Sequence, residues 1–139
     1  MNPTVLRKSS NDFFACDMSN YPYINVLTKA RKPTDEEFEE YINLLDDIYA
    51  NCEKFVFIME TDGNAPYMKS EQRIRLGNWT KQNKEIIAQR CKGCAFLIRS
   101  FLQETVLKGI FIIQKPPYEY ILEKDREKCN EWLAKQLKK

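Results

Sequence analysis

Hydrophobic positions along the chain fall into short apolar stretches and longer stretches with helical spacing. The short stretches are rich in aromatic and β-branched residues and predict strands over residues 13–17, 23–29, 54–60, 94–99 and 118–122. Apolar residues at helical spacing predict helices over residues 35–51, 70–91, 101–114 and 124–138. Because strands that alternate with helices form parallel pairs, the pattern predicts an α/β fold. We expect a single-domain mixed, mostly parallel sheet with an N-terminal antiparallel hairpin and about four helices.

The first predicted helix has the clearest start signal. Thr34 is the expected N-cap, and Glu37 follows three residues later, which together make a capping box. Acidic residues in the first turn also suit the positive end of the helix dipole. The apolar residues of this helix fall on one side, which we therefore expect to be buried.

Length and composition indicate one folded domain. The chain has 139 residues, of which 43% are hydrophobic and 30% are charged, as in ordinary globular proteins. We assign residues 1–11 to an N-terminal arm or edge strand and residues 12–139 to the domain. The N-terminus has no apolar run of the signal-peptide kind, and no segment is apolar enough for a transmembrane span. A cytoplasmic location is expected.

The residue types present exclude several kinds of chemistry. The chain has no histidine, which removes Ser-His-Asp and Cys-His catalysis and most zinc sites. Its five cysteines are odd in number and scattered, so a disulfide framework is not expected. We expect no cofactor and no bound metal.

Charge is distributed unevenly along the chain. Residues 34–53 contain eight acidic residues and no basic ones, whereas residues 69–92 contain seven basic residues and two acidic ones. The basic segment could bind phosphate groups or the acidic helix of another molecule. The alternative is that its charged side chains simply face solvent. It contains a single tryptophan, so the aromatic platform of single-strand binders is missing and nucleic acid is an unlikely partner.

Five segments of the chain resemble a known family, and they read YPY, PTDEEFEEYINLLDDI, FVFIMETDG, CKGCAFLI and YEYILEKDREKCNEWLAKQL. Through these segments, residues 12–137 resemble the STAS-like family, which includes anti-sigma-factor antagonists, and the related lipid-binding CRAL-TRIO fold. The resemblance implies a small α/β domain with a regulatory role and no enzymatic activity. Many STAS regulators carry a phosphorylated serine after an aspartate, and Ser70 is the matching residue here, preceded by Lys69 in place of the acidic neighbour. Ser70 is thus a candidate phosphosite as well as a candidate helix N-cap.

The predicted helix over residues 101–114 is the strongest functional candidate. Its apolar residues exceed what one core-facing stripe needs, and those expected to meet a partner or ligand are Phe101, Leu102, Val106, Ile110, Phe111 and Ile113. The alternative is that neighbouring elements bury the whole helix. Lys108 and Lys115 would suit an anionic group beside it.

Two further motifs are candidates. Asp62 and Asn64 follow the predicted central strand, where open α/β sheets bind ligands, and Glu60, its last residue, would add a carboxylate; turn residues in this position also simply make a turn. Cys91 and Cys94 form a CxxC pair, which suggests a redox site. A thioredoxin-like thiol lies at a helix N-terminus, however, whereas this pair is expected between a helix end and a strand. A loop residue and a buried strand residue are the simpler interpretation.

These observations predict a non-catalytic regulatory or protein-interaction module. It would use the apolar helix over residues 101–114 and the adjacent strand-end loop, with a protein partner or a second copy of the chain. The alternative is a small hydrophobic-ligand or lipid-binding protein, with its pocket under the same helix. A thiol redox protein is a third hypothesis.

Overall fold

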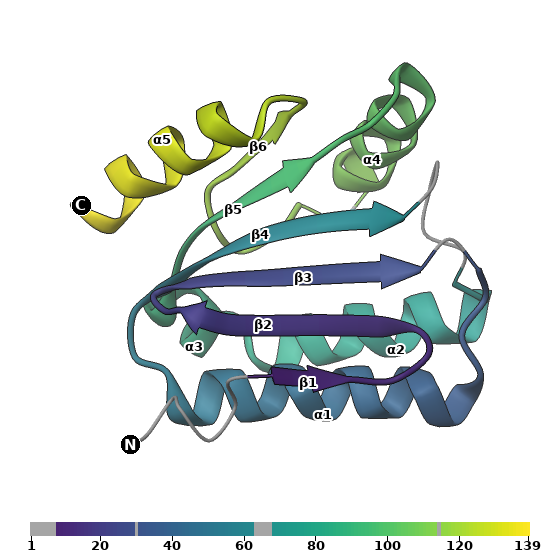
Figure 1. The fold of residues 1–139 in the computed structure, drawn as a ribbon. Helices are drawn as coiled ribbons and strands as arrows, with labels where there is room; N and C mark the ends of the chain where they lie inside the picture. Colours follow the sequence, from purple (N-terminus) through teal and green to yellow (C-terminus); the bar gives the residue numbers. More distant parts are fainter. Residues whose placement is uncertain (1–7, 30, 63–67, 114) are drawn as a thin grey trace.

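The computed structural model describes residues 8–29, 31–62, 68–113 and 115–139 of the chain. The described elements form one six-stranded sheet whose strands lie in sequence order, with helices on both faces (Figure 1). The strands are β1 (Lys8–Ser10), β2 (Phe14–Asn20), β3 (Tyr23–Lys29), β4 (Phe55–Asp62), β5 (Cys91–Leu97) and β6 (Tyr120–Glu123). The helices are α1 (Asp35–Asn51), α2 (Ser70–Gln82), α3 (Lys84–Arg90), α4 (Phe101–Ile113) and α5 (Arg126–Leu137).

The pairing of the strands agrees with the expected mixed sheet. β1, β2 and β3 are antiparallel neighbours, while β3, β4, β5 and β6 pair in parallel. The parallel pairs are joined by helices because a parallel connection must cross over from one end of the sheet to the other. β1 is an edge strand of the sheet, and it lies within residues 1–11, the segment expected to be an arm or edge strand.

The two faces of the sheet are covered to different extents. Phe55 and Phe57 of β4 point toward the large core beneath α1, α2 and α3, whereas the alternate residues Val56 and Ile58 join a smaller core beneath α5. α4 also lies on the α1 face, since its Phe111 ring contacts Phe96 of β5, which belongs to the edge of the large core.

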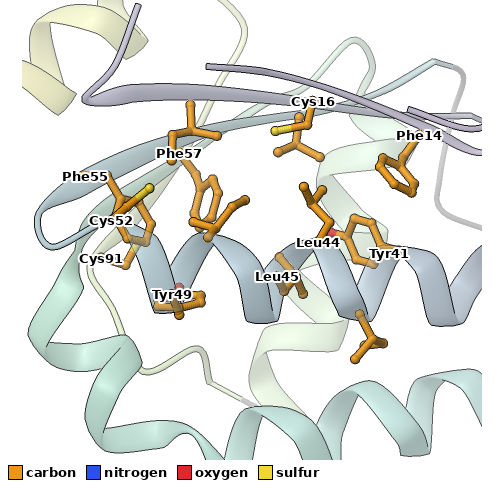
Figure 2. Packing of buried hydrophobic residues seen from close by; sticks show 14 of the residues in the cluster. Phe14, Cys16, Tyr41, Leu44, Leu45, Tyr49, Cys52, Phe55, Phe57 and Cys91 are labelled. Atoms are coloured by element: carbon orange, nitrogen blue, oxygen red, sulfur yellow. The ribbon is translucent and has the colours of Figure 1, made fainter. Parts of the chain in front are cut away.

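The start of α1 follows the local sequence. The Thr34 hydroxyl accepts the Glu37 backbone N–H at 3.0 Å, and the Glu37 carboxylate accepts the Thr34 N–H at 2.9 Å. This confirms the predicted capping box, which satisfies two backbone donors that a helix N-terminus would otherwise leave unpaired. One face of α1 is buried and includes Tyr41, Leu44, Leu45 and Tyr49. Figure 2 shows Tyr41 and Leu44 between the helix and the sheet.

Several predicted element boundaries differ from the structure, and two of the differences have a clear physical reason. The helix expected over residues 70–91 is divided into α2 and α3 at Asn83, whose backbone N–H and side-chain amide both bond the Trp79 carbonyl. The strand expected from Cys94 begins three residues earlier, at Cys91. Its pairing with β4 shifts between Phe55 and Val56, so Lys92 is an extra residue in the ladder. Such a bulge changes the alternation of side chains between the faces.

Candidate functional site

α4 is held to the sheet at its N-terminal end by polar contacts. The Ser100 side chain accepts the Gln103 backbone N–H at 3.2 Å, in the manner of an N-cap. The Gln103 side chain is buried, and its oxygen accepts the Arg99 backbone N–H at 2.6 Å. The end of β5 and the first turn of α4 are therefore tied together.

The inward side of α4 packs on an aromatic group. The Phe111 ring lies 5.1 Å from the Phe96 ring and 4.7 Å from the Tyr120 ring, measured between centroids. Leu107, one turn earlier, is also buried, and Val106 is half-buried. These contacts fix which side of α4 faces the sheet.

Four large apolar side chains of α4 are exposed. Phe101 is 75% exposed, Leu102 55% and Ile112 86% on the side away from the sheet, while Ile110, at the flank of the helix, is 39% exposed. Of the six residues predicted to form a surface, Phe101, Leu102 and Ile110 are therefore exposed, Val106 is half-buried, and Phe111 faces the sheet. The side chain of Ile113 lies outside the described part of the structure. Ile112 was missed because a helix that is apolar around most of its circumference has no sequence signal for its outward side.

Of the residues predicted at the strand end, the structure describes Glu60 and Asp62, which have different surroundings. Glu60 lies within β4, and its carboxylate accepts hydrogen bonds from Arg126 at 2.8 Å and Arg99 at 3.4 Å. Asp62 is exposed, with one carboxylate oxygen 4.0 Å from the Lys29 ammonium. Asn64 lies outside the described residues. Because Arg99 directly precedes Ser100 and α4, the Glu60 carboxylate is linked to the start of that helix.

A shallow hollow lies on the other face of the sheet, beyond the edge of α5. It has a volume of about 300 Å³, and its lining includes Ala15, Asp17, Asn25, Leu27 and Glu60. Arg126 reaches over this region, since its guanidinium also contacts the Asn25 side chain at 3.5 Å. The Glu60 carboxylate in this hollow is thus already hydrogen-bonded to Arg99 and Arg126.

Ser70 is an exposed residue in the first turn of α2, and it is not the N-cap. Lys69 occupies the cap position, and its backbone N–H is accepted by the Gln72 side chain at 3.0 Å. The Ser70 hydroxyl instead accepts a bond from Arg73 at 3.2 Å. An exposed hydroxyl beside a guanidinium and a helix N-terminus suits a phosphate, so phosphorylation of Ser70 stays a prediction.

The acidic and basic segments meet within the same molecule. Arg75 of α2 bonds both oxygens of Glu39 of α1 at 3.2 Å, and the Lys69 ammonium lies 3.0 Å from Asp35. The Trp79 indole also donates to Asp46 at 2.7 Å. Lys69 and Arg75 of the basic segment therefore already pair with the acidic helix of their own molecule.

Cys91 and Cys94 both lie in β5 and both face the large core, because the bulge at Lys92 separates them. The interpretation of Cys91 as a loop residue was wrong. Burial raises the pKa of the Cys91 thiol to about 12, and burial likewise raises the pKa of the Cys94 thiol well above its usual value. The thiolate, which is the reactive form, is therefore scarce at neutral pH.

Within the described ranges, no cluster of side chains is arranged to hold a metal ion.

We expect the thiols to resist alkylation in the folded protein. All five are buried, and burial raises the pKa of Cys52 and Cys129 to about 11. At pH 7.5 a thiol with the pKa of Cys91 is ionised on the order of one part in ten thousand or less. Iodoacetamide followed by mass spectrometry should show little modification until guanidinium is added, and the rate should still be rising with pH above the usual thiol range. Rapid labelling of Cys91 and Cys94 under native conditions would revive the redox hypothesis.

The comparisons with known proteins concern the fold. No model of a protein family matches the chain. No curated protein matches it either. Within residues 8–29, 31–62, 68–113 and 115–139, no helix is both long enough and apolar enough to cross a membrane.

Two solved structures are similar to different degrees. An enoyl-CoA hydratase from Bacillus anthracis matches 66% of this chain and 39% of its own, with 15% identity and a TM-score of 0.39, which supports no conclusion. An uncharacterized protein of the DUF3478 family from Shewanella loihica PV-4, with a SpoIIAA-like fold, matches 90% of this chain and 98% of its own, with 20% identity and a TM-score of 0.59. The protein described here therefore has a SpoIIAA-like, or STAS-like, α/β fold, as its sequence resemblance predicts.

Proposed function

We propose that the protein is a non-catalytic regulatory or interaction module that binds a protein partner through the outward face of α4. The observation that carries this proposal is the exposure of Phe101, Leu102, Ile110 and Ile112 on one short helix. Adjacent exposed apolar residues of this size mark interaction surfaces more often than isolated ones do. Burying each one against a partner contributes roughly 1.5–3 kcal/mol before the costs of association are subtracted.

The way α4 is held favours binding. Gln103, Leu107 and Phe111 fix the helix against the sheet, so its outward face is already ordered before a partner arrives. Ordering a surface in advance lowers the entropic cost of association. The face therefore needs little rearrangement to dock.

Positive charges beside the exposed apolar residues of α4 indicate the kind of partner. Lys108 is exposed on α4, where its only close carboxylate in the described residues is Glu104 at 4.0 Å, and Lys115 is exposed just beyond the helix. The partner we propose is an apolar groove with acidic residues at its rim. Opposite charges at a rim speed association and fix orientation more than they add affinity.

A carrier of lipids or other hydrophobic ligands is the alternative function. It needs a pocket under α4, but no α4 side chain lines the hollow beside Glu60 or a second, open hollow where β5 and β6 begin. Native mass spectrometry of freshly purified protein distinguishes the two functions. An added lipid mass would favour the carrier, and a bare dimer would make a second copy the partner.

The proposed function is tested with the double variant Phe101→Ser, Ile112→Ser. A photo-crosslinking residue at position 102 should capture one defined partner in cells, and the double variant should reduce that capture at least about tenfold, since the most exposed apolar anchor at each end of α4 is lost. The matched control is Ile74→Ser on α2, where Ile74 is also exposed.

The outcome depends on two comparisons. Both variants should keep the urea midpoint of the wild-type protein, because the substituted side chains lie on the surface. Unfolding of the double variant would show that the α4 face is core. Equal loss of capture in Ile74→Ser, or no loss in the double variant, would remove α4 as the docking surface.

A further inference from the structure

Gly109 lies at an exposed position in the second half of α4. Glycine inside a helix makes the fold less stable than alanine does, because a chain with glycine loses more backbone freedom on folding. Two structural features can require glycine at such a position. One is a backbone conformation that other residues avoid, and the other is close packing against a neighbour.

The fold of this chain supplies neither reason. Gly109 has the ordinary backbone conformation of a helix, and a Cβ built on it would meet nothing within 4 Å in the described part of the chain. At Gly93, in contrast, a Cβ would lie 3.0 Å from the Gln136 Cγ. Figure 1 shows α4 standing apart from α1, α2 and α5, so none of these helices approaches Gly109. The fold itself therefore has room for a larger residue at this position.

Gly109 forms the lowest point of the exposed side of α4. Residues three and four apart are neighbours on a helix surface, so Ile112 and Thr105 adjoin Gly109 on that side. Four residues at positions i, i+3, i+4 and i+7 form the hole that receives one side chain of a facing helix. In α4 the residues with this spacing are Thr105, Lys108, Gly109 and Ile112.

This hole is apolar apart from one charged wall. The Thr105 hydroxyl donates to the Phe101 carbonyl at 3.0 Å, so this donor is already satisfied within the helix. Ile112 forms an apolar wall and is 86% exposed. The Lys108 ammonium lies 4.0 Å from the Glu104 carboxylate and is largely exposed, so a carboxylate from outside can also pair with it.

We propose that Gly109 is the point of closest approach between α4 and its protein partner, where a large apolar side chain of a partner helix enters the hole. An acidic residue beside that side chain pairs with Lys108. This inference rests on the proposed function, and it specifies that one helix of the partner's apolar groove crosses α4 at Gly109. Glycine at this position makes the fold less stable but leaves room for the partner.

Enlarging residue 109 tests the proposal, because stability and binding should then change in opposite directions. The protein captured by photo-crosslinking at position 102 is identified by mass spectrometry, expressed and titrated against the full chain. Gly109→Ala should raise the urea midpoint and yet weaken binding about threefold. Gly109→Leu should keep at least the wild-type urea midpoint and weaken binding at least about tenfold, because the hole is filled.

Two control variants separate the shape of the hole from other effects. Thr105→Val keeps the shape and removes a hydroxyl that is bonded within α4, so it should leave binding unchanged. Asn43→Leu introduces leucine at an exposed position of α1 and should also leave binding unchanged. Equal weakening by Asn43→Leu, or wild-type affinity of Gly109→Leu, overturns the inference.

The double variant Phe101→Ser, Ile112→Ser separates this inference from the proposed function. If the double variant loses the partner while Gly109→Leu binds it normally, α4 is the docking surface but the partner does not approach closely at Gly109. If the double variant still binds the partner, both the proposed function and the inference are wrong. Weakening by the double variant and by Gly109→Leu, with both controls unchanged, is the result we expect.

Discussion

Replacing Phe57 with alanine is expected to lower the free energy of unfolding by about 3–5 kcal/mol, a large part of the stability of a domain of this size. Phe57 lies in the middle of β4 and is 1% exposed. Its ring is 5.1 Å from that of Phe55 and 6.4 Å from that of Tyr49, with both pairs packed edge to face (Figure 2). Removing the ring loses these contacts and leaves a cavity between the sheet and α1, which rigid neighbours fill only in part.

Urea unfolding followed by circular dichroism measures this effect. The matched control is Phe101→Ala, which removes the same side chain from the exposed face of α4 and should change the free energy of unfolding by less than about 0.5 kcal/mol. The pair separates the two kinds of apolar residue in this chain, those that stabilise the fold and those that remain for a partner. Similar losses in both variants would mean that the α4 face is part of the core.

Replacing Gly93 with valine is expected to cost about 2–3 kcal/mol through overpacking between β5 and α5. A Cβ at this position would lie 3.0 Å from the Gln136 Cγ and 3.1 Å from the Trp132 Cζ3, which is closer than side chains normally approach. Valine adds two methyl groups beyond that atom, so α5 must move away from the sheet. Since α5 covers the smaller core with Cys129 and Leu133, the displacement exposes apolar surface as well.

Fluorescence of Trp132, recorded together with urea unfolding, reports this change at the substituted site. Gly109→Ala is the matched control, because nothing lies within 4 Å of a Cβ built there. In the middle of a helix, that substitution should stabilise the protein by about 0.5–1 kcal/mol. A Gly93→Val variant with wild-type stability and unchanged Trp132 emission would show that α5 is held less closely than the structure indicates.

The parts of the fold that could be predicted are those with local signals. Thr34 and Glu37 are three residues apart, and the side chain of each bonds the backbone N–H of the other. The start of α1 could therefore be predicted from neighbouring residues alone. The strand over Tyr23–Lys29 was predicted with its observed bounds, because its apolar alternation lies within the strand itself.

The parts that could not be predicted depend on distant residues. The break at Asn83 has neither proline nor glycine to mark it, and its hydrogen bonds return to Trp79 within the same helical pattern. The early start of β5 depends on pairing with Phe55, which is far away in sequence. The outward side of α4 is set by Phe96 and Tyr120 on two other elements, so periodicity alone could identify an apolar helix but not the residues it exposes.

The sequential order of the strands has a consequence for how the chain acquires its structure. Each strand pairs with the one synthesised just before it, from β1 through β6, so no strand waits for a later one to be inserted between existing neighbours. A chain emerging from the ribosome is therefore able to extend the sheet at one growing edge, with every crossover helix completed before the next strand docks. α5 follows β6 in the chain and covers β4 and β5, which until then leave Val56, Ile58 and Ala95 open to water. The smaller core is thus closed only after all six strands of the sheet are available.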